Sequence, residues 1–212
     1  MSRQSPRRPR VTAAIIRSAA LTLFAEKGYQ ATSLRDIGAA VGVHAGSLYN
    51  HISSKDELLF SLLCDSISDR LEALRQATQA VDDPLERLRV AIDIVIRHRF
   101  EEHREIFVSQ SELRALKPEQ RAGVVALRDA YEAELEGVLT NAAGKAGLRV
   151  GDSKLVVYVI IAIGQQVARW YQPDGRLTLA EISLFYQDFF LASMGPPGML
   201  GSRGGKPRAR VQ

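Results

Sequence analysis

The chain has little of several features that other classes of protein need. One cysteine, Cys64, in 212 residues leaves no internal disulfide, which suits a reducing compartment. Its longest uncharged apolar stretch, Leu155 to Ala168, has 14 residues, whereas roughly 18 or more are needed to span a bilayer. No apolar run typical of a signal peptide follows the first residues, MSRQSPRRPR. We therefore expect a cytoplasmic protein with no membrane partner.

Motifs that carry catalysis or bind cofactors are also missing. The sequence contains no nucleophile elbow, no HExxH, no glycine-rich phosphate loop and no CxxC pair. His98 and His103 are five residues apart on an expected helix, so they do not share a face as paired metal ligands do. We expect no enzyme activity, no cofactor and no metal site.

Acidic residues are scarce at the two ends of the chain. Residues 1–55 hold eight Lys/Arg against two acids, a net charge of +6, and residues 195–212 hold four Lys/Arg and no acid. Residues 56–194 carry a net charge of −6. A basic end on an acidic body suits a protein that approaches a polyanion with one end only. Residues 1–10 and the Gly/Pro-rich 195–212 are expected to be a disordered basic arm and tail, and their charge also fits two solvated tails.

The pattern that is present is helical almost throughout. No segment alternates apolar and polar residues as a strand does, so the expected fold class is all-α with about nine helices. Capping residues mark several starts, among them Ser33, Asp83 before Pro84, and Thr178 with Glu181 three residues on. The expected helices cover about residues 11–28, 34–41, 45–51, 54–79, 85–101, 104–115, 118–146, 153–171 and 178–194.

Residues 34–51 indicate a helix-turn-helix. Two helices meet at a turn at Gly42, and the second helix is short and polar. The polar face of this second helix is free to enter a major groove, and Ala45 and Gly46 are small enough for a close approach to base edges. The apolar residues expected to face inward and fix the angle between the helices are Leu34, Ile37, Val41, Leu48 and Ile52.

The side chains that follow these small residues fit contacts with DNA. Tyr49, Asn50 and His51 can reach phosphates, bases or thymine methyl groups. Lys55 stands near the start of the next helix, where a cation and free N–H groups can bind a phosphate. Two structural alternatives stay open: Tyr49 packing against the first helix, and His51 interacting with a helix dipole.

The stretch AALTLFAEKGYQATSLRDIGAAVGVHAGSLYNHISSKDELL resembles the TetR family of bacterial transcriptional regulators. The similarity covers about residues 10 to 60. The residues that carry it at the family's spacing are Phe24, Gly28, Tyr29, Thr32, Arg35, Ile37, Gly42, Val43, Gly46, Ser47, Leu48, Tyr49, His51, Lys55 and Leu58.

The resemblance implies a domain plan and a function. Residues 11–55 would be a helix-turn-helix DNA-binding domain, and residues 56–194 a helical ligand-binding and dimerisation domain. The implied protein is a repressor that binds a palindromic double-stranded operator as a homodimer and is released by a small-molecule effector. It would lie in the bacterial cytoplasm, on the nucleoid when bound to DNA. A helix-turn-helix protein without an effector, and a regulator of a response to drugs or aromatic compounds, are the alternatives.

Roles are carried over from the family by position. Thr32 and Ser33 resemble phosphate contacts, Arg35 a base or phosphate contact, residues 44–51 the recognition helix, and Lys55 the phosphate-gripping lysine. The full expected DNA-binding set is Thr32, Ser33, Arg35, His44, Ala45, Gly46, Ser47, Tyr49, Asn50, His51 and Lys55.

Three residues depart from the family's pattern. His44 replaces the usual Ser or Thr cap, so the short helix is expected to be weakly capped and His44 to be free to read bases. Gly38 replaces Ala, which costs about 1 kcal/mol of helix stability. Ile52 replaces the common Phe.

The last two expected helices, about 153–171 and 178–194, predict a dimer interface. The segment KLVVYVIIAIGQQVARWY is apolar nearly all round, so it must be covered on every side. A broad apolar face on the last helix is made by Ile182, Phe185, Tyr186, Phe189 and Phe190. Two copies of this pair would form a four-helix bundle; closure of the monomer core alone is the alternative.

An effector is expected inside residues 85–175. Arg121 and Arg128 are seven residues apart on one helix face and could bind an anionic ligand, or be solvated or paired with Glu132. The other expected effector-binding residues are Tyr158, Gln165 and Arg169. Two stretches in this half, REIFVSQSELRALKPEQRAGVVALRDAYE and WYQPDGRLTLAEISLFYQDFF, are similar to TetR-type regulators that sense acyl-CoA thioesters; an apolar drug-like or phenolic ligand competes with this interpretation.

Overall fold

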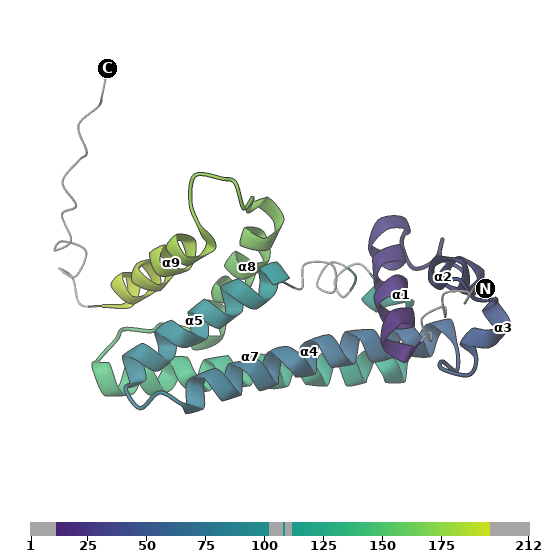
Figure 1. Ribbon diagram of the computed structural model, residues 1–212. Helices are drawn as coiled ribbons and strands as arrows, with labels where there is room; N and C mark the ends of the chain where they lie inside the picture. Colours follow the sequence, from purple (N-terminus) through teal and green to yellow (C-terminus); the bar gives the residue numbers. More distant parts are fainter. Residues whose placement is uncertain (1–11, 102–107, 109–111, 196–212) are drawn as a thin grey trace, which may run out of the picture. The chain divides into compact units, whose positions relative to one another are not determined.

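The computed structural model describes residues 12–101, 108 and 112–195, and Figure 1 shows the helices that they form. These residues form eight α-helices and one 3-10 turn, with no strand among them, which confirms the all-α fold class. The elements are α1 (Ala13–Lys27), α2 (Leu34–Val41), α3 (Ala45–Leu48), α4 (Lys55–Gln79), α5 (Pro84–Glu101), the 3-10 turn η1 (Leu113–Ala115), α7 (Pro118–Ala146), α8 (Ser153–Trp170) and α9 (Leu179–Met194).

The chain divides into two compact units. The first is drawn from Met1–Leu71 and Glu102–Tyr131, and the second from Glu72–Glu101 and Glu132–Gln212. Helices α4 and α7 each contribute residues to both units. The domain boundaries expected from the sequence stay a prediction.

The first unit is organised around a small core that holds α1, α2, α3 and the start of α4 together. Ile37 of α2 and Leu48 of α3 are fully buried, as the helix-turn-helix pattern predicts. Leu34, Val41 and Ile52 are only half-buried. Each fully buried aliphatic side chain contributes about 1.5–3 kcal/mol relative to an exposed one. The remaining buried apolar residues of these helices include Ile16, Ala20, Phe24, Leu58 and Leu59.

The tight turn between α2 and α3 explains one departure from the family pattern. Gly42 closes α2 with a left-handed φ of 74°, a conformation that glycine adopts at no steric cost. The N–H of Val43 donates to the Gly38 carbonyl at 2.9 Å. A Cβ atom on Gly38 would lie 2.7 Å from the Val43 carbonyl oxygen. Gly38 is therefore a packing requirement of the turn as well as a weak helix former.

The second unit packs α8 and α9 on α5, with the later part of α7. Its buried residues come from all four helices: Leu88, Ile92 and Val95; Leu135 and Leu139; Val157, Ile160 and Val167; Ile182 and Phe190. An ion pair joins Arg89 to Asp188 at 2.8 Å, and Ser183 donates to Asp93 at 2.6 Å. These polar contacts fix α9 against α5.

Several predicted helix starts are confirmed. Asp83 Oδ1 accepts a hydrogen bond from the N–H of Glu86 at 2.8 Å, and Ser54 Oγ accepts one from Glu57 at 3.0 Å. Thr178 and Glu181 form the expected capping box.

Two of the expected helices differ in the structure or lie mostly outside its described residues. The expected helix at 45–51 ends at Leu48 and continues as turn. The expected helix at about 104–115 lies mostly outside the described residues, and its described end is the η1 turn. His103, the side chain of His98, the expected disordered arm 1–10 and all of the expected tail 195–212 except Gly195 are also outside them.

Neither a membrane-spanning helix nor a metal cluster is present among the described residues. No helix there is long and apolar enough to cross a bilayer, and no three His, Cys, Asp or Glu side chains lie together as metal ligands. Cys64 is half-buried in α4, and burial, followed by the charges of Asp65 and Glu57, raises the pKa of its thiol. A raised pKa disfavours the reactive thiolate.

Candidate nucleic-acid interface

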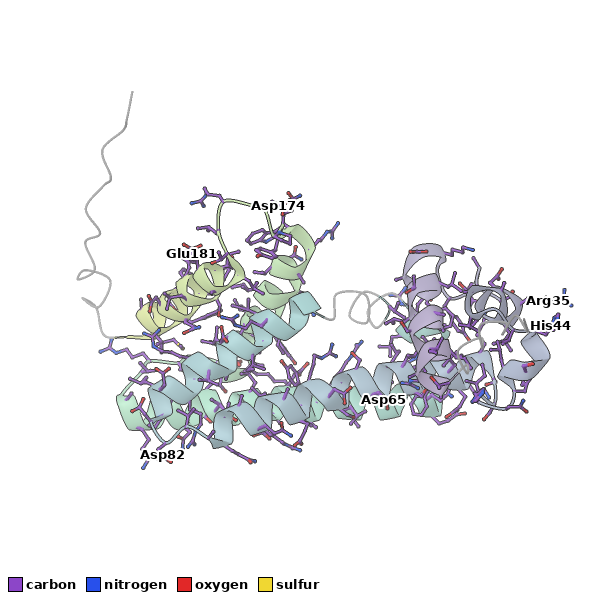
Figure 2. All side chains as sticks on the ribbon, viewed as in Figure 1. Arg35, His44, Asp65, Asp82, Asp174 and Glu181 are labelled. Carbon is purple, nitrogen blue, oxygen red and sulfur yellow. The ribbon has the colours of Figure 1, made fainter. Side chains whose placement is uncertain are left out.

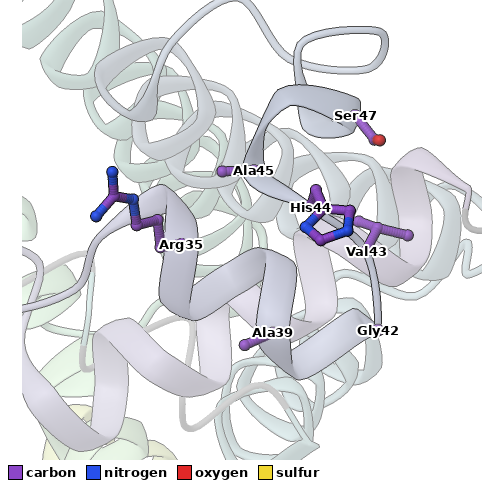
Figure 3. A pocket seen from close by; sticks show the side chains of 7 residues that line it. All are labelled: Arg35, Ala39, Gly42, Val43, His44, Ala45 and Ser47. Atoms are coloured by element: carbon purple, nitrogen blue, oxygen red, sulfur yellow. The ribbon is translucent and has the colours of Figure 1, made fainter.

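The helix-turn-helix presents a solvent-open hollow of about 700 Å³ between α2 and α3. Figure 3 shows Arg35 and Ala39 on the α2 side, with Gly42, Val43 and His44 in the turn and Ala45 and Ser47 on α3. Arg35 and His44 project from the surface of this part of the first unit (Figure 2). Four of the seven lining residues, Arg35, His44, Ala45 and Ser47, belong to the expected DNA-binding set.

Helix α3 has four residues, and Leu48 is the buried one among them. His44 occupies its N-cap position and makes no side-chain cap hydrogen bond, so the expected weak cap is confirmed. Leu48 is fully buried, and its carbonyl accepts hydrogen bonds from His51 at 2.8 Å and Ile52 at 3.0 Å. The buried Leu48 side chain therefore fixes the position of α3 and of the polar side chains next to it, although the helix has only four residues.

Most of the expected DNA-binding residues are exposed. Tyr49 is 60% exposed, so it is not a core residue. Arg35 makes no ion pair within the described part of the chain, which leaves its guanidinium available. The exposed members of the set are Ser33, Arg35, His44, Gly46, Ser47, Tyr49, Asn50 and His51; Ala45 and Lys55 are half-buried.

Thr32 is buried, and its hydroxyl is already hydrogen-bonded inside the protein. Its side chain is 1% exposed, and its hydroxyl lies 2.9 Å from the Gly28 carbonyl oxygen, to which it donates. The hydroxyl thereby satisfies a carbonyl at the end of α1, where helices leave such groups unpaired. A phosphate contact from this hydroxyl would require that hydrogen bond to break.

Ser33 starts α2 through a reciprocal bond with Asp36. Asp36 N–H donates to Ser33 Oγ at 3.2 Å, while Ser33 N–H donates to the Asp36 carboxylate at 2.8 Å. The hydrogen bonds from the Ser33 side chain and backbone lower the pKa of Asp36. The Asp36 charge stabilises the helix N-terminus but occupies the place where a phosphate would be attracted.

Lys55 is partly engaged inside the protein. Its Nζ donates to the backbone carbonyls of Tyr29 and Thr32, at 2.9 Å in each case. An ammonium group has three N–H donors, so one is left for a phosphate. Lys55 thus fastens the loop between α1 and α2 whether or not it also touches DNA.

Tyr29 is the centre of this loop, and sequence reasoning missed that role. Its ring packs edge-on against Phe24, with centroids 5.2 Å apart, and its hydroxyl donates to Asp56. The Tyr29 N–H donates to Glu112 Oε1 at 3.3 Å. Burial, the hydrogen bond to Asp56 and the charges of Asp56 and Glu112 raise the pKa of the Tyr29 hydroxyl. No local sequence pattern reveals partners that lie 27 and 83 residues away.

The expected effector-binding residues are distributed over both units. Arg121 is exposed in the first unit and donates to the carbonyls of Arg114 and Leu116 at 3.2 Å each, and Arg128 is half-buried in the same unit. Tyr158, Gln165 and Arg169 are on α8 in the second unit. The effector-binding role of each of these residues stays a prediction.

Helices α8 and α9 leave large apolar side chains uncovered. Leu155 and Val159 of α8 are 59% and 48% exposed, and Phe185 and Phe189 of α9 are 62% and 49% exposed. The two phenylalanine rings stack with their centroids 6.4 Å apart. Closure of the monomer core does not account for side chains that lie outside that core.

Comparisons with known proteins agree with this geometry. Residues 16–62 match the family model described as bacterial regulatory proteins, tetR family, and residues 81–194 match the tetracyclin repressor-like C-terminal domain. Over 185 residues the chain is 29% identical to the HTH-type transcriptional repressor KstR2 of Mycobacterium tuberculosis, a match that covers 85% of this chain and 91% of the relative.

Solved structures share the fold over most of the chain. The TetR family regulator PfmR from Thermus thermophilus has a TM-score of 0.75 and 30% identity, with 86% of this chain and 99% of that chain covered. AibR in complex with isovaleryl coenzyme A and operator DNA has a TM-score of 0.76 and 26% identity, covering 84% and 97%. The chain therefore belongs to the TetR family, and it is a helix-turn-helix transcriptional regulator.

Proposed function

We propose that the protein is a repressor that binds a palindromic operator as a homodimer and leaves it when a small-molecule effector binds. The observation that carries this proposal is the exposed surface of α2 and α3, where Arg35, His44 and Ser47 surround an open hollow. A guanidinium can form a bidentate pair of hydrogen bonds with guanine or with a phosphate. Imidazole and hydroxyl groups can form hydrogen bonds with base edges.

Gly46 supports a close approach of α3 to DNA. A Cβ atom at this position would meet nothing within 4 Å, so the protein's own packing does not require glycine there. A small residue on the outward side of a recognition helix lets the backbone lie near a base edge or phosphate. In this proposal the close approach of DNA, and not packing inside the protein, requires a small residue at position 46.

The homodimer supplies the second recognition surface that a palindrome needs. Helices α8 and α9 are the proposed contact, because their exposed apolar residues include Leu155, Phe185 and Phe189. Soluble monomers seldom expose a cluster of large apolar side chains. Association of two chains would bury this cluster and remove it from water.

The proposed effector is an acyl-CoA thioester. The solved structure of AibR contains isovaleryl coenzyme A, and the relative KstR2 is described as a ketosteroid transcriptional regulator. Within the first unit, Arg121 and Arg128 are the proposed contacts for an anionic ligand. Within the second unit, Tyr158, Gln165 and Arg169 of α8 are the proposed effector contacts. A hydrophobic drug-like ligand and the absence of any effector are the competing proposals, and no catalytic turnover is expected.

The proposal is tested by selecting duplexes from a random DNA library with the wild-type protein. The selected sequence should be palindromic, and Arg35→Ala should weaken its binding by about 1–3 kcal/mol per half-site if Arg35 contacts a base. Arg176→Ala removes the same charge from an exposed position outside α2 and α3 and should bind as the wild type does. A library from which no sequence is enriched would refute sequence-specific DNA binding.

The effector arm uses the same selected duplex. Isovaleryl-CoA, longer acyl-CoAs and an uncharged aromatic compound are added to the protein–DNA complex, and the operator affinity is measured. An effector must lower the affinity, since a ligand shifts an equilibrium only by its differential affinity for the two states. A CoA thioester that binds tightly and leaves DNA binding unchanged is not the effector.

A further inference from the structure

The loop between α1 and α2, residues 28–33, is fastened by side chains from two distant parts of the chain. The start of α4 supplies Lys55, which binds the carbonyls of Tyr29 and Thr32, and Asp56, which accepts from the Tyr29 hydroxyl. The third fastener is Glu112, whose carboxylate accepts the Tyr29 N–H at 3.3 Å. This last contact joins residues 83 positions apart within the first compact unit.

Glu112 and Tyr29 share a compact unit but fall in the matches to two different family models. Tyr29 lies in the residues that match the N-terminal family model, 16–62, and Glu112 lies in those that match the C-terminal model, 81–194. The N–H of Glu112 donates to the carbonyl of Val108 at 2.9 Å, and Val108 is fully buried. The carboxylate is thus placed by a buried part of the C-terminal match and reaches the helix-turn-helix.

The Glu112 carboxylate lies close to the backbone of the loop at Gly28 and Tyr29. A Cβ atom on Gly28 would lie 3.8 Å from Glu112 Oε1, so the carboxylate rests beside the Gly28–Tyr29 peptide. Gly28 has a φ of 84°, which ends α1 and turns the Tyr29 N–H out of the helix. Tyr29 lies beyond the last residue of α1, and its part-buried N–H donates to Glu112 Oε1 and so is not left without an acceptor.

The loop leads directly into α2, the first helix of the proposed DNA-binding surface. Lys55 ties the Tyr29 and Thr32 carbonyls to one point, and Ser33 directly afterwards caps α2. Helix α2 carries Arg35 and packs on α3 through buried Ile37 and Leu48. A displacement at Tyr29 is therefore passed to the orientation of Arg35 and of α3.

We propose that Glu112 is a positioning residue for DNA binding, contributed by the C-terminal part of the chain and acting through the Tyr29 N–H. It makes no contact with DNA itself. A displacement of the Glu112 carboxylate changes the surface of α2 and α3 by loosening or tightening the loop. This inference rests on the proposed function and names one contact through which that function is regulated.

The test compares three variants on the duplex selected by the wild-type protein. Glu112→Ala removes the acceptor and should weaken specific binding roughly fivefold, the size expected for one lost hydrogen bond. Glu112→Gln keeps an oxygen that can accept the Tyr29 N–H, and should stay within about twofold of the wild type. Glu119→Ala removes a carboxylate from an exposed site in the first turn of α7 and should have no effect.

Two further readouts separate positioning from a general loss of stability. Hydrogen exchange of a peptide covering residues 28–33 should accelerate in Glu112→Ala and stay as in the wild type in Glu112→Gln. The slope of log affinity against log salt should not change, because no phosphate contact is lost. Wild-type affinity in Glu112→Ala overturns the inference, and so does an equal loss in Glu112→Gln.

Failure of the proposed function has a different signature. In that case the wild type itself selects no duplex, while exchange of residues 28–33 still accelerates in Glu112→Ala. If the wild type selects a duplex and exchange in Glu112→Ala is unchanged, the link between Glu112 and the loop is refuted while DNA binding stands.

Discussion

The Nζ atom of Lys55 lies 4.2 Å from the centroid of the Tyr29 ring and donates a hydrogen bond to the Tyr29 carbonyl at 2.9 Å. One cation therefore contacts both the ring and the backbone of the same residue. This double contact gives Lys55 a structural role that a phosphate-binding lysine on a free surface would not have.

Lys55→Met should accordingly lower the melting temperature. Hydrogen bonds to a charged donor contribute about 1.5–3 kcal/mol each, and a contact with a ring adds about 0.5–1 kcal/mol. The salt dependence of DNA binding tests the phosphate role: if the third N–H binds phosphate, the slope falls by about two for a symmetric dimer. A lower melting temperature with an unchanged slope would leave Lys55 as a clamp of the loop alone.

Tyr49→Ala should reduce specific DNA binding without reducing stability. The side chain is 60% exposed, so its removal should change the free energy of unfolding by less than about 0.5 kcal/mol. Specific binding should weaken by about 1–3 kcal/mol per half-site if Tyr49 contacts a base, and non-specific binding by less. Equal losses on selected and random duplexes would assign Tyr49 to the DNA backbone.

Gly38→Ala should destabilise the protein, against the usual direction for glycine in a helix. The added Cβ would lie 2.7 Å from a backbone oxygen of Val43, and we expect a loss of about 1–3 kcal/mol. Gly137 in α7 is the matched control, because a Cβ there meets nothing within 4 Å. Gly137→Ala should stabilise by about 0.5–1 kcal/mol, measured by urea denaturation. A gain in stability for both variants would show that the turn yields easily.

Phe185→Asp should separate the homodimer. The side chain is 62% exposed on α9, and a carboxylate cannot be buried between two chains without a large desolvation cost. Light scattering should report about twice the 23.4 kDa chain mass for the wild type and the chain mass for the variant. Val125→Asp, at a position 40% exposed on α7, should remain dimeric. A monomeric wild type would refute the proposed interface.

The Asp36 carboxylate should titrate below its usual pKa of 3.8, because Ser33 hydrogen bonds favour its ionised form. A folded-state pKa below the unfolded value means that the stability contribution is present above about pH 4 and is lost as pH falls through the lowered pKa. Ser33→Ala should raise the Asp36 pKa towards 3.8 in an NMR titration. Glu181, whose pKa is lowered in the same way by Thr178, is an internal control that should not move.

Much of the fold was predictable because its signals are local. A helix cap depends on residues three positions apart, so Asp83 and Thr178 mark helix starts that the structure confirms. The helix-turn-helix was predictable for the same reason, since Gly42 and the spacing of Ile37 and Leu48 lie within a few turns of chain. The position of a proposed effector site was not predictable in this way, because ligand sites in helical domains are built from scattered positions.

The sequence by itself determined the helices, the turn and the basic charge of the N-terminal end, since each of these depends on near neighbours or on composition. Tertiary structure alone decided what individual polar groups do. Thr32 turns its hydroxyl inward to Gly28, Lys55 uses two donors on a loop 26 residues back, and Glu112 reaches Tyr29 across 83 residues. The physical reason is that a buried hydrogen-bonding group takes whichever partner folding brings within about 3 Å, and its distance along the chain does not limit that choice.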